Sequence, residues 1–246
     1  MMMIDCHTHV GTHHTFSETP DEMIQSLRSS GLSGMLSCPM SGTMAADEKE
    51  LIAGNEEALV LHEKHPDFLY PGTALHPLYP EKSIYYLEKF GERGLFWTGE
   101  NLSYHCEIPF DDERWLKLFR ICNERHLVVQ LHNAPDVVKL AAALPELTIV
   151  GSHLNPEVLP QLVQYENVYI DISGFHGGLC RGTIPRARSL FGAQRLLFGS
   201  DFPGYDVEPF ILRVKQFFPE SEQADVFAGN LLNLMKKHNM FWEPGA

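Results

Sequence analysis

The chain has 246 residues, of which 44% are hydrophobic and 21% charged, as in an ordinary globular protein. Its formal net charge of −13, with histidines counted as neutral, disfavours a surface that binds nucleic acid or an anionic membrane, because neutralising phosphates requires Lys and Arg. The length suffices for one large hydrophobic core.

The five cysteines form no CxxC pair and are odd in number, which favours reduced thiols in a cytosolic protein. The first residues lack the basic and apolar regions of a secretion signal. No apolar stretch approaches the roughly 18 residues that a membrane span requires. We therefore expect a cytoplasmic protein without a membrane partner, and the sequence carries no signature of an oligomeric state.

Eight short apolar runs typical of β-strands recur along the whole chain. They cover residues 2–10, 34–40, 68–76, 94–102, 127–133, 147–154, 168–173 and 196–202. Amphipathic segments of helical character lie between most of them, for example at residues 47–65, 111–125, 135–143, 157–164 and 206–217. Several begin with helix start signals, such as Thr19-Pro20-Asp21-Glu22. Strands that alternate with helices predict parallel βαβ units.

Eight such units in about 250 residues match the size of an α/β protein of the (β/α)8 TIM-barrel type. A doubly wound sheet is the alternative, but it normally has fewer strands and a glycine-rich first turn. No linker, repeat or low-complexity tract divides the chain. We therefore expect residues 1–246 to form a single barrel domain, with residues 224–238 as a helical tail outside the barrel.

Two histidines in the first apolar run carry the clearest chemical signal. His7 and His9 are two residues apart, so on a strand they project from the same face. Two neutral imidazoles presented in this way form half of a site for zinc or a similar divalent metal. The first turn, His-Thr-His-Val-Gly, thus suits metal chemistry better than a dinucleotide.

Three further polar side chains fall at the ends of later runs: His132, His153 and Asp201. The active site of a (β/α)8 barrel lies at the carboxyl ends of its strands, so all three are at the expected end. Strand alternation places His132 on the face of Gln130, His153 on that of Gly151, and Asp201 on that of Gly199. The alternates are apolar and are expected to face the outer helices: Val129, Leu131, Val150 and Phe198.

The ordered segments DCHTHVG, QLHNA, GSHLN and GSDFP resemble the amidohydrolase superfamily of metal-dependent (β/α)8 hydrolases, especially its amidohydrolase-2 branch. The resemblance extends from residue 4 to about residue 230. It implies a catalytic barrel in which His7, His9, His132 and Asp201 bind metal. His153 would either bind a second metal or polarise the substrate.

The fourth strand departs from the pattern of many two-metal relatives, which place a carboxylated lysine there. This chain has Thr98-Gly99-Glu100-Asn101 instead. Glu100 would bridge two metals, as a glutamate does in some members, or else the site would resemble that of one-metal members. Zinc is the expected ion, as one or two equivalents, and manganese, iron or cobalt would also suit histidine and carboxylate ligands.

The resemblance and the ligand types predict a metal-dependent hydrolase that cleaves a C–N or C–O bond of a small molecule, such as an amide, cyclic imide, ester or lactone. A divalent metal lowers the pKa of bound water from about 15.7 to near 7, which provides hydroxide at neutral pH. Asp201 would accept a proton and return it to the leaving group. His132 or His153 would stabilise the developing oxyanion.

The segment 174–188 is expected to be a loop that holds a carboxylate or phosphate of the substrate through its arginines. Within this region we expect His176 and Arg181 to bind substrate. Asp171 should lie on the inward face of the seventh strand and orient a ligand histidine from behind.

Three other functions remain as alternatives. Some amidohydrolase-2 relatives are decarboxylases that use a similar ligand set. The Gly99-Glu100 pair also resembles TatD-like nucleases, although the acidic charge of this chain opposes nucleic acid. A non-catalytic metal protein is the third alternative, but structural zinc usually has four protein ligands, often cysteines.

Overall fold

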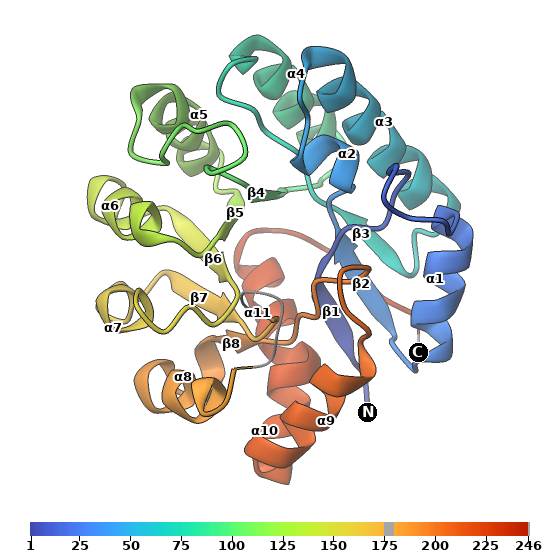
Figure 1. The fold of residues 1–246 in the computed structure, drawn as a ribbon, viewed down its shortest axis with the longest axis vertical. Helices are drawn as coiled ribbons and strands as arrows, with labels where there is room; N and C mark the ends of the chain where they lie inside the picture. The colour runs from blue at the N-terminus through green and yellow to red at the C-terminus, as the bar shows by residue number, and fades with distance from the viewer. Residues whose placement is uncertain (175–179, 246) are drawn as a thin grey trace.

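The computed structural model describes residues 1–174 and 180–245. Within these residues, parallel strands alternate with helices along the chain (Figure 1). The strands are β1 (Ile4–Thr8), β2 (Gly34–Ser37), β3 (Leu69–Pro71), β4 (Trp97–Asn101), β5 (Val128–His132), β6 (Thr148–Ser152), β7 (Val168–Asp171) and β8 (Leu196–Leu197). Each lies inside one of the eight apolar runs, so the prediction of eight strands is confirmed, although every strand is shorter than its run.

The strands form two parallel sheets, one with the order β1-β2-β3 and the other with the order β4-β5-β6-β7-β8. Backbone hydrogen bonds join the two sheets at both ends. At one seam the His9 N–H donates to the Phe202 carbonyl over 2.7 Å, and at the other the Thr73 N–H donates to the Trp97 carbonyl over 2.9 Å. The strands therefore follow one another in a ring with helices outside it (Figure 1), as a (β/α)8 fold requires.

The helices that connect the strands begin with helix-initiating residues. Thr19 caps the first one with a reciprocal capping box to Glu22, and Asp47 caps the longest one. The helices are α1 (Pro20–Ser29), α2 (Met40–Thr43), α3 (Glu48–Lys64), α4 (Pro80–Gly91), α5 (Glu113–Glu124), α6 (Pro135–Ala143), α7 (Leu159–Leu162), α8 (Thr183–Phe191), the 3₁₀ turn η1 (Ala193–Arg195), α9 (Glu208–Phe217), α10 (Glu220–Ala224), the π-helical turn η2 (Asp225–Gly229) and α11 (Asn230–Lys237).

Helix α8 shows that the prediction of a loop over residues 174–188 is wrong in its second half. Residues 183–191 are helical because Ile184, Ala187 and Phe191 form a buried face at helical spacing. None of the described helices is long and apolar enough to cross a membrane.

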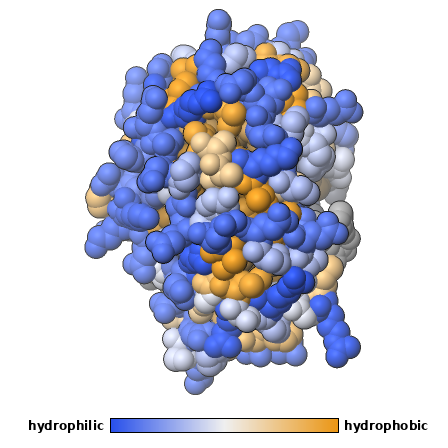
Figure 2. All heavy atoms as spheres, turned by 90° about the vertical axis from the view of Figure 1, so that its left-hand side faces the viewer, coloured by the Kyte–Doolittle hydropathy of each residue, from blue (hydrophilic) through white to orange (hydrophobic). Residues whose placement is uncertain are grey.

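Two large apolar clusters hold the strands and helices together. The first joins the buried faces of α5 to α9 to alternate strand residues such as Val129, Leu131 and Phe198. The second places Leu231 and Met235 of the C-terminal helix among strand residues. Figure 2 shows the face that carries α6, where hydrophilic residues predominate and hydrophobic ones are visible in patches between them.

The expected alternation fails on β6. Ile149 packs in the first cluster with the outer helices, whereas Val150 lies in the second cluster with Val128. Gly151 therefore does not share an inward face with His153 in the regular way. His153 lies beyond the end of the strand and has a positive φ of 71°, so a turn of the backbone, and not strand parity, sets the direction of its ring.

Candidate metal centre

The structure brings together six of the eight side chains for which the sequence predicts a catalytic, metal-binding or substrate-binding role. His7 lies at the end of β1 and His9 just after it. Their Nε2 atoms are 3.2 Å apart. The Oδ1 atom of Asp201 lies 3.5 Å from Nε2 of His7 and 3.3 Å from Nε2 of His9. These three residues form one group whose ligand atoms converge tightly enough to hold a metal ion.

A second group consists of Glu100, His132 and His153, which come from β4, from β5 and from just after β6. The Oε1 atom of Glu100 lies 3.4 Å from Nδ1 of His132 and 3.4 Å from Nε2 of His153. These histidines thus face the same carboxylate oxygen from two neighbouring strands.

Glu100 lies between the two groups. Its other oxygen, Oε2, is 3.5 Å from Nε2 of His7 and 3.6 Å from Nε2 of His9. The side chain is only 4% exposed, and Oε1 is buried without a hydrogen-bond partner among the described residues. A buried carboxylate oxygen without a donor is costly unless a cation lies beside it.

The hydrogen bonds behind the rings define which nitrogens face the centre. Nδ1 of His7 is 2.9 Å from Oδ2 of Asp171, and Nδ1 of His9 is 2.9 Å from the carbonyl oxygen of Cys38. Both acceptors favour a proton on Nδ1, which leaves the Nε2 lone pairs of neutral rings directed at each other. Two lone pairs 3.2 Å apart repel unless a cation or a proton lies between them. The donor set therefore fits a divalent metal.

Asp171 supports the histidines of this centre from behind. It lies at the end of β7 and is fully buried, and its Oδ1 accepts the backbone N–H of His153 and that of Ser173, each over 3.0 Å. The Ser173 hydroxyl lies 2.8 Å from Nδ1 of His153. Asp171 thus contacts the His7 ring from behind, as strand parity predicts, and indirectly supports His153 as well.

The carboxylates of the centre raise the pKa values of His7 and His9. Burial alone would lower the pKa of His9, but hydrogen bonds to Asp201 and Glu100 raise it to about 9. Burial would likewise raise the pKa of Glu100, but the charge of His7 and contacts with His132 and His153 hold it well below its usual range. Glu100 therefore stays ionised at neutral pH and attracts positive charge.

Two ligand candidates lie on unusual backbone. Asp201 has a φ of 68° and His153 a φ of 71°, in the left-handed region that non-glycine residues seldom adopt. Such conformations cost free energy and occur mainly where the surrounding structure enforces them, often at functional sites.

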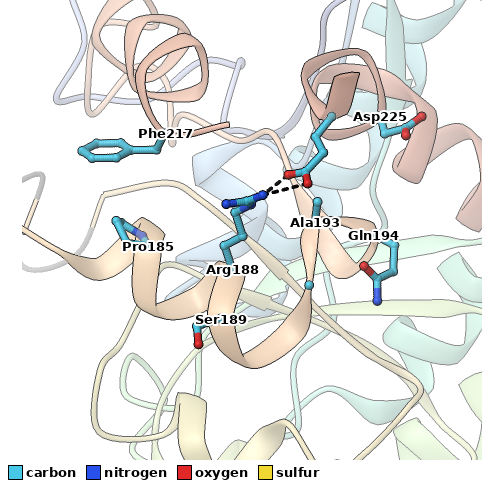
Figure 3. A pocket seen from close by; sticks show the side chains of 9 residues that line it. Pro185, Arg188, Ser189, Ala193, Gln194, Phe217 and Asp225 are labelled. Atoms are coloured by element: carbon cyan, nitrogen blue, oxygen red, sulfur yellow. Dashed lines mark hydrogen bonds and ion pairs between the residues drawn. The ribbon is translucent and has the colours of Figure 1, made fainter. Parts of the chain in front are cut away.

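The two other predicted site residues, His176 and Arg181, come from the segment before helix α8. His176 lies outside the described residues. Arg181 is exposed at the start of the segment before α8, and Arg188 lies within α8. The Arg188 guanidinium donates two hydrogen bonds of 2.8 Å to the carboxylate of Glu222 beside a surface cavity (Figure 3). The structure thus gives Arg188 a partner away from the centre.

Some residues around the centre had no sequence signal. Tyr104, on the loop after β4, places its ring edge-on to that of His132, with 5.0 Å between the ring centroids. The carbonyl of Cys38 and the hydroxyl of Ser173 are also absent from the sequence prediction. The only sequence feature that could have indicated these residues is their position shortly after the end of a strand. Many loop residues share that position.

The family model described as Amidohydro_2, Amidohydrolase, matches residues 4–230 of the chain. No curated protein matches. Among solved structures, a 2,6-dihydroxybenzoate decarboxylase from Rhizobium has a TM-score of 0.73 at 14% identity, with 96% of this chain and 99% of that chain covered. A putative amidohydrolase from Staphylococcus aureus has a TM-score of 0.73 at 15% identity, with 96% and 100% covered.

A third structure is a dihydroxybenzoic acid decarboxylase from Polaromonas sp. JS666 with bound manganese and an inhibitor. Its TM-score is 0.71 at 17% identity, with 98% of this chain and 99% of that chain covered. At these identities the structural matches establish the fold alone. The family model covers nearly the whole chain, and the chain therefore belongs to the Amidohydro_2 family of amidohydrolases.

Proposed function

We propose that the protein is a two-metal hydrolase that cleaves a C–N or C–O bond of a small molecule, such as an amide, cyclic imide, ester or lactone. The observation that carries this proposal is the position of Glu100. One carboxylate oxygen faces His132 and His153 and the other faces His7 and His9. A carboxylate shared in this way would suit a pair of ions, which would activate water and polarise the bond that is cleaved.

Each proposed ligand group has an anion and histidines, which suits zinc, and manganese as well. His7, His9 and Asp201 would hold one ion, His132 and His153 the other, and Glu100 both. When bound, such ions lower the pKa of water and polarise a carbonyl group of the substrate. Nδ1 of His153 lies beside the Ser173 hydroxyl and Nε2 faces Glu100, which favours a ligand role over direct polarisation of the substrate.

Asp201 is the proposed proton carrier. Its side chain is 21% exposed, whereas that of Glu100 is 4% exposed and that of Asp171 is buried. Its contacts with both histidines are made by Oδ1, so Oδ2 is the oxygen that can accept a proton from the attacking water and return it to the leaving group. The side chain of His132 is 25% exposed, so its ring is accessible to a substrate and would assist the developing oxyanion.

A metal-dependent decarboxylase of the same family is the second candidate, because two of the structural neighbours are decarboxylases by name. The two reactions leave different products, since a decarboxylase releases carbon dioxide and a hydrolase consumes water. The nuclease alternative has less support, because the formal net charge of −13 opposes binding of nucleic acid. A purely structural metal is disfavoured because Asp201 and His132 are partly open to solvent.

The first test is the metal content of the protein purified without chelator or affinity tag. We expect about two equivalents per chain in the natural sequence and about one or fewer in Glu100→Gln, because the amide has lost the charge that two ions would share. Glu63→Gln, an exposed position on α3, is the control and should keep both ions.

The metal-loaded protein is then assayed on a panel of lactones, aryl esters and amides, with carbon dioxide release from aromatic carboxylates measured in parallel. Hydrolysis by the natural sequence and its loss in Asp201→Asn, with the metal retained, would support the proposal. One equivalent of metal with release of carbon dioxide would replace it by the decarboxylase. No bound metal after incubation with zinc and manganese would refute both.

A further inference from the structure

A cavity other than the one beside Arg188 lies at the carboxyl ends of the strands, near the candidate metal centre. It is a cavity of about 530 Å³ between the loops that follow β1, β2 and β4. We call it the mouth cavity and define it by six of its lining residues: His13, His14, Met40, Met44, Glu50 and His105. Its volume lies in the range of small-molecule sites.

Chain connectivity places the mouth cavity next to the proposed ligands. Thr12, which also lines it, is three residues after His9. Met40 is two residues after Cys38, whose carbonyl holds the His9 ring. His105 follows Tyr104, whose ring contacts that of His132. In each of three loops, a residue that lines the cavity is thus separated by only a few residues of chain from a ligand candidate or from a residue that contacts one.

The walls of the mouth cavity combine apolar surface with uncharged donors. Met40 and Met44 are half-buried, and their polarisable thioethers pack well against aromatic groups. The backbone N–H of Thr15 lies 3.4 Å from Nδ1 of His13, and the Thr15 hydroxyl lies 2.7 Å from the same atom. If Nδ1 accepts from Thr15, the proton of the neutral ring is on Nε2, which then acts as a donor.

The charges around the mouth cavity disfavour an anion. Neither Lys nor Arg lines it, and Glu50 supplies a carboxylate. Partial burial and the neighbouring His14 lower the pKa of His13, so its ring is uncharged at neutral pH. An anionic group in this cavity would meet the charge of Glu50 without a fixed cation to offset it.

We infer that the mouth cavity holds the part of the substrate remote from the bond that is cleaved, and that this part is an uncharged aromatic or heteroaromatic group with a hydrogen-bond acceptor. That this group belongs to a substrate rests on the proposed hydrolase function, but binding in the cavity is measured without turnover. It assigns specificity to loops of this chain, and it excludes substrates that present a carboxylate or phosphate at that end.

The test compares benzamide with benzoate, because the two have the same size and differ in charge. Binding to the metal-loaded protein is measured by titration calorimetry and ligand-observed NMR at neutral pH. We expect benzamide to bind the natural sequence about tenfold or more tightly than benzoate. Glu50→Gln removes the negative charge and should narrow this difference by strengthening benzoate binding.

Two filling variants locate the bound benzamide. Met44→Trp and Thr15→Trp each add bulk to the wall, and Thr15 is exposed, so its substitution is compatible with folding. Each should weaken benzamide binding by about tenfold or more. Ser189→Trp fills the cavity beside Arg188 and Glu222 (Figure 3), which has the same volume of about 530 Å³. This control should leave the affinity unchanged.

Benzamide that fails to bind, or that binds equally well in both filling variants, would overturn the inference. Benzoate that binds as tightly as benzamide and is displaced by the same two variants would overturn its charge preference. If benzoate binds to the metal ions themselves, its affinity is the same in the filling variants as in the natural sequence. Failure of the proposed hydrolase appears instead as missing metal or missing turnover, whichever way benzamide behaves.

Discussion

At the scale of single residues, the centre depends on side chains that orient the ligands from behind. Asp171 lies 2.9 Å from Nδ1 of His7, and its other oxygen accepts two backbone N–H groups. Burial would raise the pKa of Asp171, but His7, His153 and Ser173 lower it below its ordinary value. It is therefore a fixed anion that favours the ring orientation with Nε2 towards the metal.

We predict that Asp171→Asn weakens metal binding by about 10- to 100-fold. The neutral amide is a weaker hydrogen-bond acceptor than the carboxylate, so it orients the His7 ring less firmly. Competition with a fluorescent chelator measures the affinity. The control is Asp67→Asn, an exposed position whose ion pair with Arg28 contributes little. An unchanged affinity in a folded Asp171→Asn protein would contradict the positioning role.

The positions of the ligand candidates in the fold were predictable from the sequence, whereas the groups behind their rings were not. His7, His9, His132 and Asp201 lie at or just after strand ends, and a ring of parallel strands brings such positions together whatever the loops do. Ser173 and the Cys38 carbonyl contact the histidines through backbone turns that no spacing rule specifies. The direction of the His153 ring follows from its positive φ, which is why the expected alternation failed there although His153 lies in the second group of ligand candidates.

At the scale of elements, helix α3 holds the loop that follows β1 in place. Both carboxylate oxygens of Glu57 lie 2.9 Å from the donating backbone N–H of Thr12, and the Thr12 hydroxyl donates to Oε1 over 2.6 Å. Gly11 allows this approach, because a Cβ there would lie 2.8 Å from Oε2 of Glu57 and 2.6 Å from Cβ of Pro39. The loop that carries His13 and His14 is thereby joined to α3.

We predict that Glu57→Ala speeds amide hydrogen exchange at Thr12 and lowers the free energy of unfolding by about 0.5–1.5 kcal/mol, the usual net value of such hydrogen bonds. Exchange is followed by NMR and stability by urea unfolding. Glu63→Ala on the same helix is the control, since Glu63 is exposed. Equal exchange at Thr12 in both variants would show that the loop keeps its conformation without α3.

Elements were predictable where apolar periodicity is strong. Residues 135–143 were predicted as a helix and α6 has the same limits, because Pro135 starts it and Val137, Leu140 and Ala141 form one buried face. Helix α8 was missed because its arginines and Pro185 hide a shorter apolar pattern. Strand β8 has only two residues, since the chain turns to place Asp201 at the centre.

At the scale of the whole molecule, buried His76 should make the stability of the fold sensitive to acid. Burial, and next the charge of His105, lower the pKa of His76 to about 4. The unfolded chain binds a proton at the ordinary histidine value near 6.5, so stability from neutral His76 is present above that pH and is lost as the pH falls towards 4.

We therefore predict that His76 contributes a decrease in the free energy of unfolding of the metal-free protein between about pH 6.5 and 4, and that His76→Gln removes this contribution of up to about 1.4 kcal/mol per pH unit. Urea unfolding at a series of pH values, with chelator present, measures both. His14→Gln, at an exposed position, is the control. A slope unaffected by His76→Gln would contradict the assignment.

The proposed ions would also join the two sheets of the barrel where the strand ladders are weakest. At the seam between β8 and β1, the N–H of Cys6 donates to the Phe198 carbonyl and that of Asp201 to the His7 carbonyl. At the seam between β3 and β4, the N–H of Gly99 donates to the Thr73 carbonyl. His7 and Asp201 come from opposite sides of the first seam, and Glu100 adjoins the second.

Metal bound to these residues therefore links one sheet to the other, and its binding free energy becomes folding free energy. We predict that a chelator lowers Tm, and that metal at about 1,000 times its Kd restores about 4 kcal/mol of stability. Removal of the metal should speed hydrogen exchange first at the seam amides of Cys6, Gly99 and Asp201. The amide of Gln130, inside the five-stranded sheet, should change less. Uniform acceleration at all four amides would mean that the ions stabilise the fold as a whole, without a particular role in holding the seams.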